Sequence, residues 1–331
     1  MTNDVVVVGG GVIGLTAAVT LAEDGHGVRV ISRDPAADTT SAVAGGLCWP
    51  YRIQPEARAL AWFVRSFQAF ARLAERAEET GVRMAEGTMV DTGDWDPDAW
   101  HETIREPRQD PGTVPNPRRA TAAELPAGYE SGWRARTPLV DMPVYLRYLE
   151  RRLVAAGGTV ERRPVRSLEE EGRSAGAVVN CSGLGARELA PDRTVHPVQG
   201  QVVVVENPGI EEWFAAPGSR SAILTSVLPQ PYGLVLGGTA RAHVWSRRPE
   251  PAIAEAIVDR CARAFPQLAG ARILAHKVGL RPARPTVRLT SEPLANGVPC
   301  VHNYGHGGAG VTVSWGCAQE VAELLRGVGE G

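Results

Sequence analysis

Three glycines near the start of the chain have the spacing of a pyrophosphate-binding turn. Gly9, Gly11 and Gly14 form a G-x-G-x-x-G sequence directly after a run of four valines. Glycine at these positions permits a tight turn, a close approach of backbone to phosphate, and close packing of helix on strand. The N–H groups of Val12 and Ile13 open the following apolar helix, where the helix dipole favours an anion. The pattern predicts a dinucleotide site.

The next apolar segment, residues 28–34, ends in charged residues at the position where the adenosine of a dinucleotide binds. Dinucleotide folds often place an acid near the end of this strand to bind the ribose. The end reads Ser32-Arg33-Asp34, so Asp34 is a candidate for the ribose hydroxyls. An arginine at the same place can also bind a 2′-phosphate, so Arg33 keeps NADP open as the nucleotide.

The elements that position these residues indicate an α/β protein. A continuous valine run is typical of a parallel strand covered on both faces. Helical patterns and further strands follow, and a last strand and closing helix return to the cofactor. We expect helices at 54–81, 141–156 and 253–264 and through Arg326, and strands at 159–165, 177–181, 199–206, 222–228, 233–239, 272–280 and 300–304.

The run of strands in the second half predicts a mainly antiparallel sheet interwoven with the cofactor domain. We assign residues 1–81, 141–195 and 281–331 to a Rossmann-like FAD-binding domain, and residues 82–140 and 196–280 to a substrate-binding domain. Most of residues 84–117 is rich in Pro, Asp and Trp without a clear period, which predicts a surface loop.

Composition argues against several other classes of protein. The 331 residues include 35 basic and 37 acidic side chains, a net charge of −2 that gives no nucleic-acid or membrane signature. No apolar run approaches ~18 residues, and the first strand leaves no room for a signal peptide. The five scattered cysteines form no C-x-x-C pair, so we expect neither a disulfide framework nor a metal site. These features favour a cytoplasmic protein, and a homodimer stays open.

Four further segments resemble the D-amino-acid oxidase family. The stretch VHNYGHGGAGVTVSWGCA (residues 301–318) is similar to that family's signature, and LRPARP (280–285) to its arginine-bearing strand end. NCSGLGA (180–186) and AGGLCWPY (44–51) resemble two of its flavin-contact segments. With the glycine turn, the resemblance spans nearly the whole chain.

The resemblance implies non-covalent FAD, with its pyrophosphate on the three N-terminal glycines. Glycines beside the flavin ring also have a physical reason that does not depend on the resemblance, since only a backbone without Cβ can lie against a ring face. The start of the closing helix would bring its positive end near the electron-accepting edge of the flavin. The further cofactor contacts that the resemblance implies are Thr39, Thr40, Ser41, Gly45, Gly46, Leu47, Val165, Ser182, Gly307, Gly308, Gly310, Val311 and Thr312.

The resemblance also implies how a D-amino acid is bound and oxidised. Arg281 matches the arginine that binds the substrate carboxylate, where a planar fork suits two parallel bonds, and Arg284 is its rival. The Gly308 carbonyl would accept a hydrogen bond from the amine. In the family a hydride leaves Cα for flavin N5, the imino acid hydrolyses to an α-keto acid and ammonia, and O₂ becomes hydrogen peroxide. We expect His302 and His306 to hold loop backbone by hydrogen bonds rather than to act as bases.

The sequence departs from the family at one position in the substrate pocket. Many members carry a tyrosine that supports the carboxylate, and alignment on the following strand places Ser226 there. Tyr51 and Tyr232 are the nearest replacements. Trp49 and Leu47 would add apolar walls, which predicts a preference for neutral, apolar D-amino acids. D-aspartate specificity would need an extra cation, for which Arg241 is a candidate.

Four alternative functions stay open at this point. D-aspartate oxidase belongs to the same family, and a glycine- or sarcosine-type amine oxidase would share the FAD fold. An NAD(P)-dependent dehydrogenase would also use the glycine turn. A non-catalytic flavin-binding subunit would bind FAD and release no peroxide.

Overall fold

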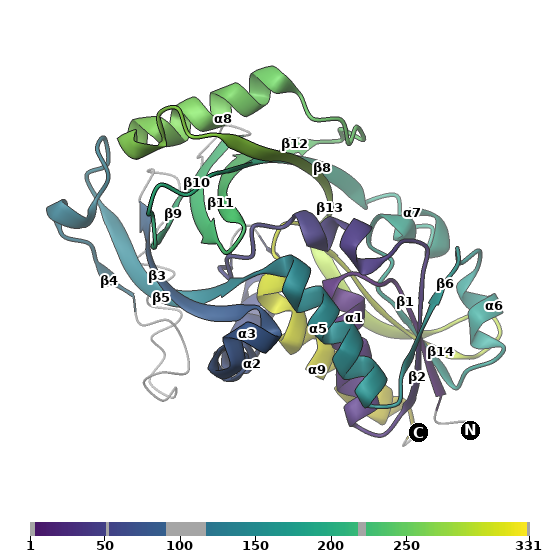
Figure 1. Ribbon diagram of the computed structural model, residues 1–331. Coiled ribbons are helices and arrows are strands. Elements are labelled where there is room, and N and C mark those ends of the chain that lie inside the picture. Colours follow the sequence, from purple (N-terminus) through teal and green to yellow (C-terminus); the bar gives the residue numbers. More distant parts are fainter. Residues whose placement is uncertain (1–3, 51–52, 91–116, 218–222, 330–331) are drawn as a thin grey trace.

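A computed structural model describes residues 4–50, 53–90, 117–217 and 223–329 of the chain. Its strands make one continuous sheet, partly parallel and partly antiparallel, with helices packed against both parts (Figure 1). This architecture confirms the predicted α/β class with an interwoven, mainly antiparallel sheet.

The parallel part of the sheet is organised around the first strand. Its members are β1 (Asp4–Val8), β2 (Gly27–Ser32), β6 (Thr159–Arg162), β7 (Ala177–Asn180) and β14 (Pro299–His306). They lie in the order β14-β7-β1-β2-β6 with all neighbours parallel. The four valines of β1 are at most 3% exposed, as expected for a strand covered on both faces.

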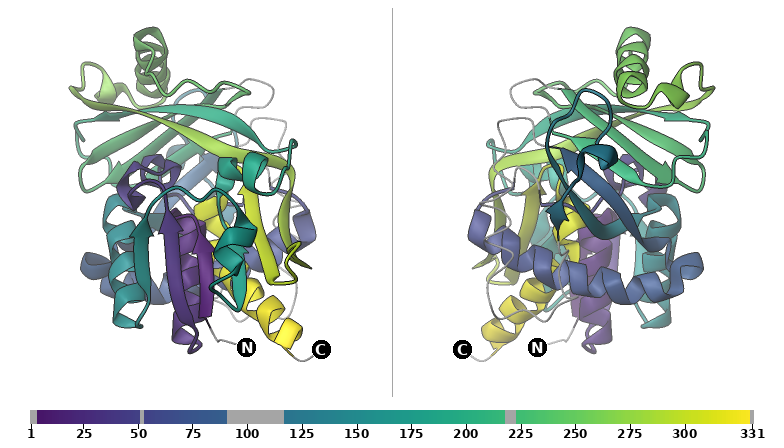
Figure 2. Two further views of the ribbon diagram at one scale, coloured as in Figure 1. Left: turned by 90° about the vertical axis from the view of Figure 1, so that its right-hand side faces the viewer. Right: turned by 90° about the vertical axis from the view of Figure 1, so that its left-hand side faces the viewer.

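Four long helices pack on one another and on the parallel strands. They are α1 (Val12–Glu23), α2 (Glu56–Leu73), α5 (Met142–Ala155) and α9 (Gly310–Gly329). Figure 2 shows them gathered below the antiparallel part, beside β1 and β2. As predicted, Asp141 caps α5, because its carboxylate accepts a hydrogen bond from the Val144 N–H at 3.2 Å.

The antiparallel part is a curved sheet with two different faces. Its strands are β3 (Val82–Val90), β4 (Arg118–Arg119), β5 (Gly132–Val140), β8 (His196–Val205), β9 (Trp213–Ala216), β10 (Ile223–Gln230), β11 (Gly233–Thr239) and β12 (Arg241–Ala242). Helix α8 (Pro251–Ala264) covers the outer face (Figure 1). The inner face, toward the parallel part, carries the apolar side chains Ala85, Met89, Ala135, Leu139, Val202, Val204, Trp213, Ala215, Leu228 and Val235, and Trp49 packs against them from the segment that precedes α2.

One long strand joins the two parts. β13 (Ile273–Pro293) pairs with β8 over its first half and with β14 over its second half. Its register shifts between Ala283 and Arg288, just after the predicted substrate arginine. The strand predicted at 272–280 is therefore too short. The division of the chain into two domains stays a prediction, since hydrogen bonding along β13 is continuous from one part to the other.

Some predicted elements have other bounds. The helix expected at 54–81 is interrupted at Arg76, whose φ of −125° and ψ of 53° are not helical, and Gly81 ends the last turn at φ +73°. β5 and β9 were not predicted. The remaining short elements are η1 (Ala36–Asp38), η2 (Thr40–Val43), η3 (Ala74–Arg76), α3 (Ala77–Thr80), η4 (Ala122–Glu124), α6 (Leu168–Gly172), η5 (Gly183–Gly185), α7 (Ala186–Leu189) and η6 (Pro266–Leu268).

Two properties of the described residues concern the membrane span, the disulfides and the metal site that the sequence argues against. No helix among them is long and apolar enough to span a membrane. The five cysteines are buried free thiols, and no group of three acidic, histidine or cysteine side chains within the described ranges could hold a metal ion. Most of the predicted surface loop before residue 117 lies outside the described residues.

Candidate active site

The N-terminal glycines form a turn that needs glycine at its first and third positions. Gly9 has φ +118°, and a Cβ added there would overlap the carbonyl oxygen of Cys181. A Cβ at Gly14 would overlap the carbonyl of Gly9, so the third glycine lets α1 pack against the turn. Gly11 is the N-cap of α1 and meets only the Ser41 hydroxyl, at 3.1 Å. The turn thus leaves the start of α1 open to a pyrophosphate.

The hydroxyl segment after β2 is tied to the neighbouring elements by its side chains. Ser41 Oγ accepts a hydrogen bond from Val12 N at 2.9 Å, at the first turn of α1. Thr40 Oγ1 donates to the carbonyl of Leu280 at 2.9 Å, directly before Arg281. Thr39 donates within its own turn, to Ala36 at 2.7 Å. Thr40 thereby links the predicted cofactor segment to the arginine-bearing strand.

At the end of β2, the two charged residues pair with each other. Arg33 donates through Nε and Nη2 to one oxygen of Asp34, at 3.0 and 2.7 Å. This hydrogen bond from Arg33 lowers the pKa of Asp34, so the acid is ionised at neutral pH. Arg33 is largely exposed and already paired, which weakens the argument for a 2′-phosphate.

Residues 45–49 lie between the two parts of the sheet. A Cβ at Gly45 would meet the Leu228 side chain, and one at Gly46 (φ +83°) would overlap the Val140 carbonyl. Because Gly45 and Gly46 have no side chain, this segment can pack closely on the antiparallel part. Thr312 Oγ1 contacts the backbone N and O of Trp49 at 3.2 and 3.3 Å, so its hydroxyl holds this segment to α9.

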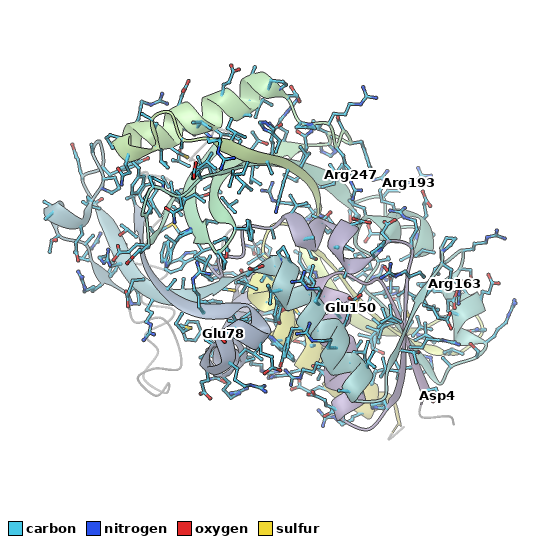
Figure 3. The ribbon with its side chains drawn as sticks, viewed as in Figure 1. Asp4, Glu78, Glu150, Arg163, Arg193 and Arg247 are labelled. Atoms are coloured by element: carbon cyan, nitrogen blue, oxygen red, sulfur yellow. The ribbon has the colours of Figure 1, made fainter. Side chains whose placement is uncertain are left out.

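Val165 and Ser182 follow the carboxyl ends of two strands of the parallel part, β6 and β7, which are separated by β1 and β2. Val165 follows β6 and packs partly buried against the cluster under β1 and β2. Arg163, labelled in Figure 3, supports this loop with two bonds to Glu171 at 2.6 and 2.7 Å. Ser182 follows β7, and a Cβ at Gly9 would be 3.4 Å from its Cα. Both residues therefore stand at the edge where ligands of such sheets bind.

Arg281 lies on the inner face of the antiparallel part. Its guanidinium covers Gly200 of β8, where any Cβ would overlap it, and its Nη1 donates to the Thr239 carbonyl at 2.9 Å. No carboxylate of the described residues lies within 4 Å of it, and burial lowers its pKa. A half-buried cation without an acidic partner is a site for an anionic ligand.

Arg284, three residues farther along β13, has the opposite surroundings. Its Nε donates to the buried Asp192 carboxylate at 2.8 Å, and its Nη1 donates to Thr286 O at 2.9 Å. Asp192 also accepts from Thr194 and from the Tyr304 hydroxyl. The charge of Arg284 is thus neutralised within the protein, which agrees with a structural role for this arginine.

The glycine-rich turn after β14 brings the start of α9 to Arg281. Gly307 has φ +55° and donates its N–H to Pro282 O at 2.9 Å, so the turn is fixed on β13. A Cβ at Gly308 would be 3.5 Å from Arg281 Cδ. Gly310 begins α9, and Val311 is buried beneath it. The two residues predicted to bind substrate, Arg281 and Gly308, are thus brought together.

The two histidines of this region are buried and hold side chains rather than loop backbone. His306 contacts the Cys317 thiol at 3.6 Å, and burial lowers its pKa to about 3. His302 contacts Asn180 at 3.1 Å and Glu292 at 2.8 Å. The prediction that they hold backbone is therefore wrong for the contacts that the structure describes. The sequence gives no sign of these partners, since they come from β7, β13 and α9.

The predicted pocket residues divide into four cases. Ser226 is buried on the inner face, where its Oγ points toward Gly237. Trp49 is buried against that face, with its ring centroid 5.9 Å from that of Trp213. Leu47 is half-buried and bridges to Leu139. Tyr232 lies in the turn between β10 and β11, under Lys277. Tyr51 lies outside the described residues.

Two residues that contact Arg281 were not predicted. Gly200 makes room for its guanidinium on the inner face, and the Thr239 carbonyl accepts a hydrogen bond from it. An isolated glycine within an apolar strand, as in VQGQVVVV, marks a close approach and was the available signal. A backbone carbonyl leaves no signal in a sequence.

The carboxyl ends of β1, β2, β7 and β14 lie at one edge of the sheet, the edge at which such folds bind a dinucleotide. Gly9 and Gly14 supply the turn, η2 closes over the start of α1, and the Gly307–Gly308 turn meets Arg281. The model of the FAD-dependent oxidoreductase (DAO) family matches residues 4–324. The chain belongs to this family. It is therefore an FAD-dependent oxidoreductase, and the predicted family resemblance is confirmed.

Similar proteins agree with this assignment over nearly the whole chain. D-amino-acid oxidase from Streptomyces coelicolor is 56% identical over 322 residues, covering 97% of this chain and 96% of that protein. D-amino-acid oxidase from Rubrobacter xylanophilus is 50% identical, covering 96% and 94%. The structure is also similar to glycine oxidase from Geobacillus kaustophilus, with a TM-score of 0.81, 21% identity and coverage of 98% and 94%. At that identity the likeness shows the fold alone.

Proposed function

We propose that this FAD-dependent oxidoreductase oxidises D-amino acids to α-keto acids, with release of ammonia and hydrogen peroxide. The observation that carries the proposal is the half-buried Arg281, without a carboxylate partner among the described residues, beside the Gly308 turn. The two D-amino-acid oxidases at 56% and 50% identity support the same substrate class. Water and O₂ complete the balance, since the imine is hydrolysed and O₂ takes the two electrons.

The residues of the chain bind and orient the two reactants. Bound FAD supplies the two-electron acceptor, and O₂ regenerates it. Arg281 binds the substrate carboxylate through its planar fork, and the Gly308 carbonyl accepts a hydrogen bond from the amine. These two contacts fix the direction of the Cα–H bond. An L-amino acid held by the same contacts would direct its Cα hydrogen away from the acceptor, so it is inert.

The cofactor is held without a covalent bond, by backbone and hydroxyl groups. Gly9, Gly11 and the first turn of α1 meet the pyrophosphate, and Asp34 meets the ribose. Every cysteine is a buried thiol with a raised pKa, which makes it a poor nucleophile for attachment to a flavin.

The inner face of the antiparallel sheet supports a preference for neutral substrates. Trp49, Leu228 and their neighbours there are apolar. Arg241, the candidate extra cation, is paired with Glu250 and contacts Gln199 at 3.4 Å. Lys277 is a further cation on this face, but it stacks on Tyr232 at 4.7 Å and lies four residues from Arg281, about 13 Å along the strand.

A panel of D- and L-amino acids, glycine and sarcosine tests the function. Peroxide, ammonia and the α-keto acid are measured with the purified, FAD-loaded protein. We expect turnover of neutral, apolar D-amino acids, much slower turnover of D-aspartate, and none of the L-enantiomers. Oxidation confined to glycine and sarcosine, or no peroxide from any D-amino acid, would contradict the proposal. The homodimer stays a prediction that sedimentation of the same protein tests.

A further inference from the structure

A chain of buried hydrogen bonds runs from Ser182 to the surface of the protein. Ser182 contacts Asn180 Oδ1 through its backbone N at 3.2 Å and its Oγ at 2.6 Å. Asn180 Nδ2 lies 3.1 Å from His302 Nδ1, and His302 Nε2 lies 2.8 Å from Glu292 Oε1. Asn180 and His302 are 0% and 3% exposed, so water does not replace these partners. The chain crosses β7, β14 and β13.

The chemistry of each group fixes the direction of every bond. A backbone N–H can only donate, so the Asn180 atom that faces Ser182 is the oxygen. The Asn180 amide nitrogen then faces His302, and because it can only donate, His302 Nδ1 must accept. The hydrogen of the neutral imidazole therefore lies on Nε2, where the Glu292 carboxylate accepts it.

This direction determines what Ser182 can offer to a ligand. A hydroxyl has one hydrogen and two lone pairs, and the 2.6 Å contact with Asn180 Oδ1 uses the hydrogen. Ser182 Oγ is left with lone pairs only, so it accepts hydrogen bonds and does not donate to a ligand. A phosphate oxygen at this position would face those lone pairs and be repelled.

We propose that Glu292, His302 and Asn180 form a positioning relay that fixes Ser182 Oγ as a hydrogen-bond acceptor for FAD. Ser182 then binds a hydrogen of the cofactor, from a ribityl or ribose hydroxyl or the adenine amine, rather than a pyrophosphate oxygen. The inference rests on the proposed function and on the contact with FAD that the family resemblance implies for Ser182. His302 is a positioning residue, because it acts on the cofactor through Asn180.

Protonation of His302 on Nδ1 would reverse the direction of the hydrogen bonds between His302, Asn180 and Ser182. A hydrogen on Nδ1 would oppose the Asn180 amide nitrogen, so the amide would turn over and Ser182 N–H would lose its acceptor. Burial and Arg288 lower the pKa of His302, and Glu292 raises it. The net effect is a pKa below the ordinary value of histidine, so the neutral form prevails at pH 7. The groups that face the ring are Asn180 from β7, Glu292 and Arg288 from β13, Cys300 and Tyr304 from β14, and Asp192 before β8.

The first test reads the position of the hydrogen directly. The FAD-loaded protein is labelled with ¹⁵N-histidine, and the His302 signals are assigned with His302→Gln. We expect Nδ1 to have the shift of an unprotonated ring nitrogen and Nε2 that of a protonated one. A hydrogen on Nδ1 at neutral pH would overturn the relay.

The second test uses Glu292, whose side chain is 48% exposed and so tolerates substitution. In Glu292→Gln the amide oxygen still accepts from Nε2, so FAD affinity of the apoprotein should stay within about twofold. In Glu292→Lys the ammonium can only donate, which moves the hydrogen to Nδ1. FAD should then bind about threefold to tenfold more weakly, as for the loss of one hydrogen bond.

Ser182→Ala separates the relay from a general change in charge. This variant should weaken FAD binding by a similar factor and should abolish the further effect of Glu292→Lys. If Glu292→Lys costs the same in the Ser182→Ala background, its effect does not pass through Ser182 and the relay is wrong. These affinities are measured without substrate, so failure of D-amino-acid oxidation would leave them interpretable.

Discussion

Arg281 and Arg284 stand three residues apart on β13, and their surroundings are opposite. Arg281 is held by a backbone carbonyl and covers a glycine, with no carboxylate of the described residues in contact. Arg284 is paired with Asp192, whose side chain is 7% exposed. The same side chain is thus prepared for an external anion at one position and neutralised by the fold at the other. The difference between the two arginines comes from Asp192, which lies 92 positions before Arg284 in the sequence.

Removal of the Arg281 guanidinium should have the largest effect on catalysis. Arg281→Ala leaves the substrate carboxylate without its partner in a desolvated site, which costs about 3–5 kcal/mol in kcat/KM. FAD content should be nearly unchanged, because the cofactor contacts lie on other elements. Steady-state kinetics with a neutral D-amino acid and the flavin absorbance of the purified variant measure both quantities.

Arg281→Lys is the matched control for this variant. A lysine keeps the charge but loses the two parallel bonds, so an intermediate loss is expected. If Arg281→Ala keeps its kcat/KM within a fewfold of the parent, the substrate carboxylate binds elsewhere and the contrast between the two arginines is lost.

Arg284→Ala should instead lower the stability of the protein. It removes one charged partner of the buried Asp192, which keeps its bonds to Thr194 and Tyr304, so unfolding should become easier by about 1.5–3 kcal/mol. The kcat/KM per bound FAD should change far less than in Arg281→Ala. Urea unfolding and kinetics on the same preparations give the comparison. A catalytic loss equal to that of Arg281→Ala would show that Arg284 also binds substrate.

The Asp192 carboxylate should make this stability depend on pH. Burial alone would raise its pKa, but hydrogen bonds from Thr194, Arg284 and Tyr304 hold it well below its ordinary value. A depressed pKa in the folded state contributes stability above the unfolded value of about 3.9, and this is lost as the pH falls through the folded pKa. Between pH 6 and pH 3 the parent should therefore lose about 1 kcal/mol more than Asp192→Asn. Equal acid sensitivity of the two proteins would contradict this.

The sequence predicted the cofactor edge better than the substrate face. The glycine turn and the closing motif are local, and each glycine has a backbone reason that can be read from its spacing. The inner face depends on pairings between distant strands. The isolated Gly200 signals a close approach but not that Arg281 makes it, and Glu250 beside Arg241 had no local signal. Likewise, the histidines were recognised as structural, but their partners were not.

Ser226 offers the sharpest comparison within the substrate face, although its expected effect is the smallest. It lies on the inner face next to Gly237 and shares that face with Arg281, as the alternation along β8, β11 and β13 requires. A Cβ at Gly237 would already meet the Ser226 hydroxyl, so a ring at 226 must extend away from β11, over the apolar lining.

Ser226→Tyr should lower the KM for small D-amino acids such as D-alanine by about threefold to tenfold. The reason is one added hydrogen bond to the carboxylate, which contributes about 0.5–1.5 kcal/mol. The same ring fills space, so the bulkiest D-amino acids should become poorer substrates. Ser226→Phe is the matched control, because it adds the ring without the hydroxyl and should show only the penalty on large substrates. If Ser226→Tyr and Ser226→Phe behave alike toward D-alanine, the hydroxyl does not reach the carboxylate. If neither changes the size preference, Ser226 does not line the pocket, and the alignment of β10 with the tyrosine-bearing strand of the family is wrong.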